Sequence, residues 1–287
     1  MRDRDVACQQ PVGCGMLACS DQETPRLRLT DMSTASSPSR NDRSAIQQLG
    51  ILVAYLVLGA TGGILGGLLL NRFERQFVVE TPDDLKPVLG IYTPQQFARI
   101  VNEQRHADHK NLPLSLGLMG SMITGALALA IGGNSGSPRV AARGLLAGLL
   151  LGALLAAMGA VLSIAAREAL RGWNTLDAQG EPHLLKSQIH TISHQAPTWL
   201  GIAAAIGLST WVTTGCPHRA RRLAGVSTLG ALLMLLCFPV LASAIHIQDT
   251  AGIIPQGWFN QAGWSVLGGL LLGFVIGRSM LHHPGEA

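Results

Sequence analysis

Two histidine pairs have a spacing that suits metal binding. His106 and His109 are spaced i, i+3, and His190 and His194 are spaced i, i+4. On a helix each pair would share one face and could present two imidazoles to a single metal ion. No HExxH element accompanies either pair, so a packing or headgroup-binding role fits the same spacing. Both interpretations stay open, and a metal ion is the only cofactor that the sequence suggests.

A second set of chemically capable side chains is predicted to form a polar cluster at the outer membrane surface. Glu74, Arg167, Glu168 and His246 each lie 15 or 16 residues beyond the glycine of a Leu-Gly-Ala triplet, and Arg72 precedes Glu74 by two residues. Such a cluster can bind an anion or a lipid headgroup, or supply acid and base groups. The simpler interpretation is that membrane helices end in charged residues at the interface.

The composition places the chain in the membrane class. Of its 287 residues 48% are hydrophobic and only 13% are charged, whereas a soluble domain has roughly a quarter charged residues. The net charge of +4 is therefore not interpreted as a nucleic-acid surface, and we expect no nucleic-acid partner. The partner that the composition implies is the lipid bilayer.

Long apolar segments predict an all-α, polytopic membrane helix bundle of about six transmembrane helices. Each segment is long enough, or nearly so, to cross a bilayer core of about 30 Å. The fourth and sixth are short. The predicted spans are 49–70, 112–131, 144–166, 198–215, 223–245 and 262–277.

An internal repeat groups these spans into three tandem hairpins, which permits a pseudo-threefold arrangement. The Leu-Gly-Ala triplet occurs once in each odd-numbered span, around Gly59, Gly152 and Gly230. Five identities link the second and fourth spans at a constant offset of 84, among them His106 with His190. The predicted repeat units are 49–133, 143–215 and 222–281. Amphipathic surface helices are expected before the second and fourth spans, the first capped by a Thr-Pro start near residue 93.

Glycines recur every fourth residue in three of the spans. Residues at this spacing share a helix face, and without side chains that face lets another helix come close. These faces predict tight packing between hairpins, or with a membrane-protein partner or a second copy of the chain. The glycines are Gly59, Gly63, Gly67, Gly144, Gly148, Gly152, Gly269, Gly273 and Gly277.

The distribution of charge among the loops predicts the orientation of the chain across the membrane. Loops 132–143 and 216–222 carry five arginines and no acidic residue, which is typical of cytoplasmic loops. Both termini then face the cytoplasm, and the bacterial cytoplasmic membrane is the expected location. Residues 1–48 are predicted to be a disordered tail, of which 1–31 precede an alternative start at Met32, and residues 282–287 form a short tail.

Function is constrained mainly by what the spans lack. No Asp, Glu, Lys, Arg or His lies inside any predicted span, and such residues normally mark ion paths and proton relays. Two functions fit best: a non-catalytic subunit of a membrane assembly, or a passive permease for a small solute. The alternative is a membrane-surface enzyme or metal-binding protein that uses the outer His, Glu and Arg groups.

Overall fold

The structure, a computed structural model, describes residues 40–74, 76–77, 93–170, 172, 184–243 and 252–282. Its contacts divide the chain into two units, residues 1–47 and residues 48–287, and the helix bundle lies in the second. The predicted N-terminal tail 1–48 lies outside the described residues as far as residue 39, and its remaining residues begin the first helix. Residues 283–287 of the predicted C-terminal tail also lie outside the described residues.

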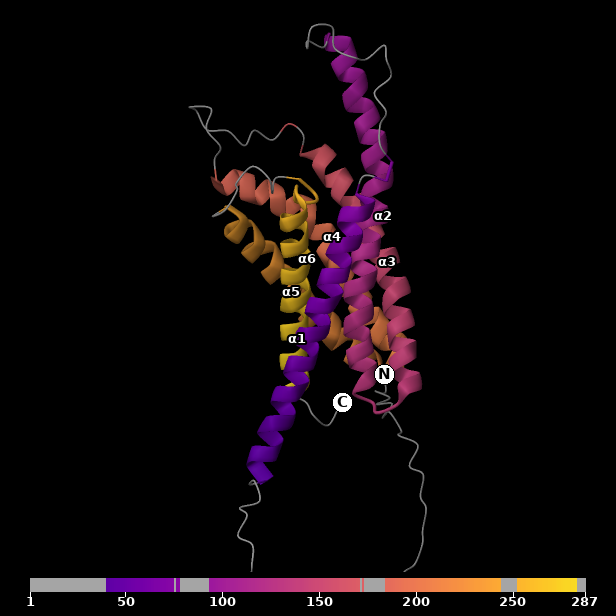
Figure 1. Ribbon diagram of the computed structural model, residues 1–287, viewed down its shortest axis with the longest axis vertical. Helices are drawn as coiled ribbons and strands as arrows, with labels where there is room; N and C mark the ends of the chain where they lie inside the picture. The colour runs from indigo at the N-terminus through magenta and orange to yellow at the C-terminus, as the bar shows by residue number, and fades with distance from the viewer. Residues whose placement is uncertain are drawn as a thin grey trace, which may run out of the picture. The chain divides into compact units, whose positions relative to one another are not determined.

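The described part of the chain is helical and contains no strand. The predicted fold class, an all-α membrane helix bundle, is confirmed. Figure 1 shows the helices. They are α1 (Arg40–Phe73), α2 (Pro94–Gly133), α3 (Pro138–Ala169), α4 (Leu184–Thr214), α5 (Pro217–Ser243) and α6 (Trp258–His282).

Five of these helices, all except α4, are long and apolar enough to cross a membrane. The first half of α4 is polar, with Lys186, Gln188 and His190, and its apolar half is short and interrupted by serine and threonines. The sixth predicted span, also short, does meet the requirement as α6. The protein is thus a multi-pass membrane protein.

Helices α2 and α4 extend further toward the N-terminus than the predicted spans. Thr93 caps α2 as expected, because its side chain accepts from the Gln96 N–H while the Gln96 side chain accepts from the Thr93 N–H. The prediction of separate surface helices before the two spans is wrong, since each continues into its span through Pro113 or Pro197. A proline inside a helix removes one backbone hydrogen bond and bends the helix without having to end it.

The even-numbered helices occupy the inside of the bundle. In the span of α2, 67% of residues are buried, and in α6 56%, against 28% in both α1 and α3. Trp199 of α4 packs on Gly268 of α6, and Ile202 of α4 approaches Gly120 of α2. The core residues Leu116, Met119, Ile123 and Leu127 of α2 are fully buried among these helices.

Each odd-numbered helix lies between two even-numbered ones. Helix α1 packs on α6 and α2, helix α3 on α2 and α4, and helix α5 on α4 and α6. Three successive hairpins around a common axis would give this order. The common ancestry of the hairpins stays a prediction.

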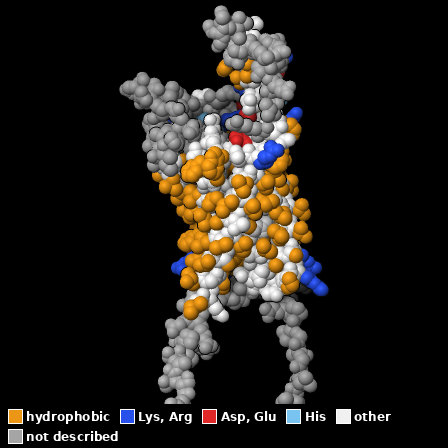
Figure 2. Space-filling view, viewed as in Figure 1, with side chains coloured by type: hydrophobic (Ala, Val, Ile, Leu, Met, Phe, Trp, Pro, Cys, Tyr) orange, Lys and Arg blue, Asp and Glu red, His pale blue; other side chains and the backbone are white. Residues whose placement is uncertain are grey.

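Charged side chains separate toward the two ends of the bundle, with an apolar belt between them (Figure 2). Within residues 48–287, every described acidic residue belongs to the end where α1 and α3 finish, which we call the acidic end; these residues are Glu74, Glu103, Asp108 and Glu168. The other end, here the arginine end, carries Arg139, Arg143, Arg219, Arg222 and Arg278.

Candidate functional site

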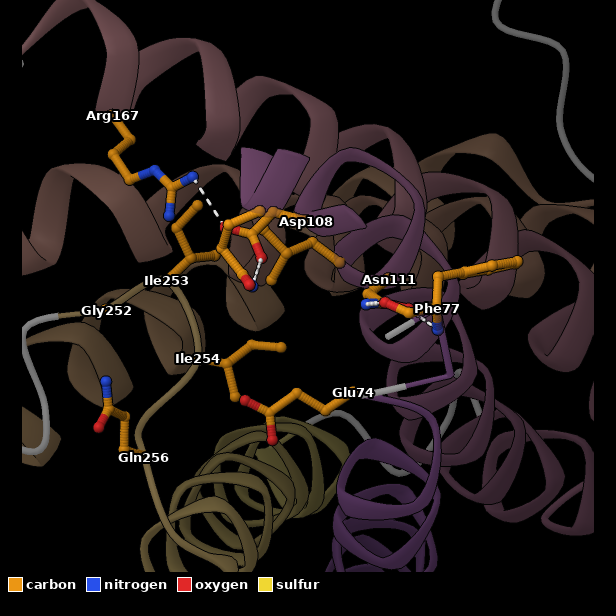
Figure 3. Close-up of a pocket in the computed structure, with 11 residues that line it drawn as sticks. Glu74, Phe77, Asp108, Asn111, Arg167, Gly252, Ile253, Ile254 and Gln256 are labelled. Atoms are coloured by element: carbon orange, nitrogen blue, oxygen red, sulfur yellow. Dashed lines mark hydrogen bonds and ion pairs between the residues drawn. The ribbon is translucent and has the colours of Figure 1, made fainter. Parts of the chain in front are cut away.

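A pocket of about 480 Å³ opens at the acidic end of the bundle. It is bordered by the end of α1, by α2, by α3 and by the segment that precedes α6 (Figure 3). Its polar lining consists of Glu74, Gln104, Asp108, Asn111, Arg167 and Gln256. We call it the acidic-end pocket.

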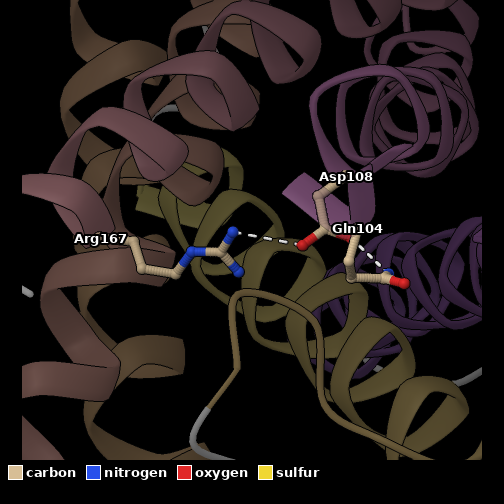
Figure 4. Close-up of polar contacts among 3 residues, drawn as sticks. All are labelled: Gln104, Asp108 and Arg167. Atoms are coloured by element: carbon tan, nitrogen blue, oxygen red, sulfur yellow. Dashed lines mark hydrogen bonds and ion pairs between the residues drawn. The ribbon is translucent and has the colours of Figure 1, made fainter. Parts of the chain in front are cut away.

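Asp108 and Arg167 form an ion pair across one side of this pocket, joining α2 to α3. Arg167 Nη2 lies 3.2 Å from Asp108 Oδ2, and Gln104 Nε2 donates to Asp108 Oδ1 at 3.2 Å (Figure 4). The two charged side chains are 32% and 27% exposed, so the pair contributes at most about 1 kcal/mol to stability. Both carboxylate oxygens of Asp108 have partners, and Asp108 therefore holds the Arg167 side chain in position.

Glu74 is presented to the same pocket from the C-terminal end of α1. Its Oε2 accepts a hydrogen bond from Nε2 of Gln261, a residue of α6 with only 1% of its surface exposed. Figure 3 shows the Glu74 carboxylate directed into the space enclosed by the lining residues. A buried amide from the last helix therefore holds a carboxylate from the first.

Buried carboxamides also fix the two segments that border the pocket. Asn111 of α2 donates to the Phe77 carbonyl at 3.0 Å and accepts from the Phe77 N–H at 2.8 Å. Gln195 of α4 donates to the Gly252 carbonyl at 3.3 Å and accepts from the Trp264 indole N–H at 3.1 Å. With Gln261, each inner helix thus supplies one buried amide at this end of the bundle.

These amides fall into the register of the predicted repeat. The offset of 84 that relates the second and fourth spans places Asn111 opposite Gln195, and Gln195-Ala196 has its parallel in Gln261-Ala262. The three residues are between 1% and 5% exposed. Buried polar groups need partners, and each of the three amides has at least one partner that lines the pocket, namely Phe77, Gly252 or Glu74.

The predicted polar cluster is assembled only in part. Glu74 and Arg167 line the acidic-end pocket together. Arg72 is exposed and, like Glu168, does not belong to the lining. His246 lies outside the described residues.

The histidine pairs do not line the pocket. His106 and His109 are exposed, whereas His194 is buried and its ring lies 4.0 Å from that of His190 in an edge-on contact. Among the described residues no three His, Cys, Asp or Glu side chains come close enough together to hold a metal ion.

Burial controls the protonation of the second pair. It lowers the pKa of His190, and together with the nearby His190 and Arg167 charges it lowers the pKa of His194 to about 4. Neither ring nitrogen of His194 has a hydrogen-bond partner among the described residues. His194 is therefore a neutral, packed ring at neutral pH.

All the glycines of the predicted smooth faces contact another helix of the same chain. Gly59, Gly63 and Gly67 face α6, and α6 returns the contact through Gly269, Gly273 and Gly277. Helix α3 faces α2 through Gly144, Gly148 and Gly152. An oligomer built on these faces would first have to separate these helices.

Sequence reasoning missed the residues that complete the pocket. Neither Asp108 nor Asn111 was among the predicted site residues. The repeat register carried a usable signal, because a polar amide recurs at equivalent places near the start of the second, fourth and sixth predicted spans.

The fold and the site together define an integral, multi-pass helical membrane protein with a charged pocket at one end of its bundle. Comparison of the chain with protein-family models, with curated proteins and with solved structures finds no match.

Proposed function

We propose that this chain is a non-catalytic membrane protein that binds a small polar solute in the acidic-end pocket, as a subunit of a membrane assembly. The observation that carries the proposal is Glu74, whose carboxylate is held toward a pocket by the buried amide of Gln261. A pocket in which a few polar groups converge among apolar side chains is the usual place for a small-molecule site.

The size and mixture of the lining support this function. Pockets for small molecules have about 300 to 1,000 Å³, with few polar groups placed among apolar side chains. At about 480 Å³, the acidic-end pocket combines its charged groups with the apolar Phe77, Leu112, Ile253 and Ile254. Its walls come from four parts of the chain, so the folded bundle sets their positions.

Two alternatives receive less support. A surface enzyme using histidine would need an imidazole at the pocket, but His190 and His194 lie outside its lining. A passive permease needs a polar path, but below the pocket the inner helices pack fully buried Met119, Ile123 and Leu127. Orientation in the membrane, homo-oligomers and membrane-protein partners stay predictions.

Ligand-dependent thermal unfolding tests the proposal. Purified protein in nanodiscs would be heated with a panel of small cations, anions, zwitterions and polyols. A ligand that binds only the folded state at about 100 times its Kd adds about 2.7 kcal/mol of stability. We expect at least one class to stabilise the wild type and to lose its effect in Glu74→Gln.

A matched control is Glu103→Gln. Glu103 is a carboxylate of α2 that pairs with Arg99 and does not line the pocket. Binding that survives in Glu74→Gln but disappears in Glu103→Gln, or a wild type that no solute stabilises, would overturn the proposed function.

A further inference from the structure

We propose that the ligand of the acidic-end pocket is a small organic ammonium ion, with its N–H groups on Glu74 and its hydrocarbon part on the apolar wall. This inference rests on the proposed function and specifies its ligand class. Three features carry it: the charge of the lining, the open acceptor of Glu74 and the neighbouring apolar surface.

Among the described residues, the charged lining of the pocket has an excess of one negative charge. Asp108 and Arg167 are paired at 3.2 Å and neutralise each other. Glu74 forms no ion pair with any described residue, and its hydrogen-bond donor is the neutral amide of Gln261. A ligand with a single positive charge would balance the pocket, whereas an anion would add to its charge.

Glu74 has acceptor capacity left for such a ligand. A carboxylate accepts hydrogen bonds at both oxygens, and Gln261 occupies only Oε2. No described residue donates to Oε1. An ammonium group has N–H donors for this oxygen and gains a charge-assisted hydrogen bond, which is stronger than a neutral one.

The rest of the lining favours an organic cation over a metal ion. Leu112, Ile253 and Ile254 border the same space and offer no oxygen ligand from their side chains. Hard cations require about six oxygen ligands, and no three described His, Cys, Asp or Glu side chains gather to hold a metal. A short alkyl chain instead gains from burial against this wall.

Isothermal titration with n-butylammonium tests the inference in nanodisc-embedded full-length protein. The matched probes are butan-1-ol, butyrate, tetramethylammonium and potassium ions. We expect n-butylammonium to bind at least about tenfold more tightly than each of them, because only it combines positive charge, N–H donors and an alkyl chain.

Variants separate recognition from folding. Glu74→Gln keeps the shape but removes the charge, and should abolish n-butylammonium binding. Arg167→Gln leaves the lining with two negative charges and should raise the affinity by about tenfold at low salt. A misfolded variant cannot gain affinity, so this increase is specific to the inferred charge balance.

The outcomes distinguish the inference from the proposed function. If butyrate, butan-1-ol or a polyol binds through Glu74 and n-butylammonium does not, the ammonium inference falls while the pocket stays a solute site. If Arg167→Gln weakens n-butylammonium binding, the charge argument is overturned. If no solute of any class binds, both fall.

Discussion

Gly59 on α1 and Gly269 on α6 lie so close together that a β-carbon added to either would overlap the carbonyl oxygen of the other. The approach continues along both helices, since a β-carbon on Gly63 would lie 2.6 Å from the Ser265 carbonyl oxygen. Close backbone approach gives membrane helices their packing energy, because lipid supplies no hydrophobic force between them. The first and last helices are joined by this contact.

Gly59→Ala should therefore destabilise the bundle. The added methyl group has no space unless α1 and α6 move apart, and overpacking of this kind typically costs about 1 to 3 kcal/mol. The measurement is the thermal unfolding midpoint in detergent.

Gly50 provides the control on the same helix. Nothing lies within 4 Å of a β-carbon at this position, so Gly50→Ala should leave the midpoint unchanged or raise it, since alanine favours a helix by up to about 1 kcal/mol. Equal effects of the two substitutions would contradict the close contact.

A second test concerns Trp199 and Gly268, which join α4 to α6. A β-carbon at position 268 would overlap the outer ring of the fully buried Trp199 indole. Gly268→Ala should lower the unfolding midpoint, and adding Trp199→Phe should recover part of the loss because phenylalanine lacks that outer ring. A double-mutant cycle measures the coupling, expected at about 0.5 to 3 kcal/mol; strictly additive effects would show that the two residues do not meet.

The sequence predicted the local features of the helices better than it predicted the contacts between helices. Spacing alone gave the glycine faces of α1 and α3, because the four-residue period is a local property of a helix. It could not give their partners: Gly59 of α1 packs on Gly269 of α6, which is far away in the sequence. Pro113 and Pro197 were expected to separate surface helices from spans, yet both helices continue through them.

The pocket shows the same difference between what local sequence patterns predict and what tertiary contacts decide. Glu74 and Arg167 were found by counting along two similar helices, which requires no knowledge of packing. Gln261 was not linked to Glu74, because the two lie 187 residues apart and meet only when α6 returns beside α1. The polarity of Gln261 is visible in the sequence, but its role depends on a tertiary neighbour.

The stability of the protein should fall as His194 is forced to protonate. Its folded-state pKa of about 4 is below the ordinary value of about 6.5, so the unfolded chain takes up a proton that the folded chain resists. The contribution of the neutral His194 ring to the free energy of unfolding is fully present above pH 6.5 and is lost progressively as the pH falls toward 4. Its neighbours His190 and Arg167 add positive charge and oppose protonation further.

His194→Gln isolates this contribution from the carboxylates that titrate in the same range. Between pH 7 and 4.5 the wild type should lose roughly 1 to 3 kcal/mol more than the variant, measured by thermal unfolding in one detergent. His106→Gln, at an exposed position, should follow the wild type. Parallel pH curves for the wild type and His194→Gln would refute the assignment.

The arginine end is predicted to face the cytoplasm, and Cys216 allows this to be measured. This cysteine is partly exposed at the turn between α4 and α5, beside Arg219 and Arg222, while His109 is exposed at the acidic end. In a background with the other cysteines replaced by serine, one variant keeps Cys216 and a second carries Cys216→Ser with His109→Cys. A membrane-impermeant maleimide should label the second variant in intact cells and the first only after permeabilisation.

The expected result follows because short arginine-rich loops are retained on the cytoplasmic side during insertion. The reverse labelling pattern would mean that factors other than the five arginines of loops 132–143 and 216–222 set the topology. It would also place the Glu74 pocket inside the cell.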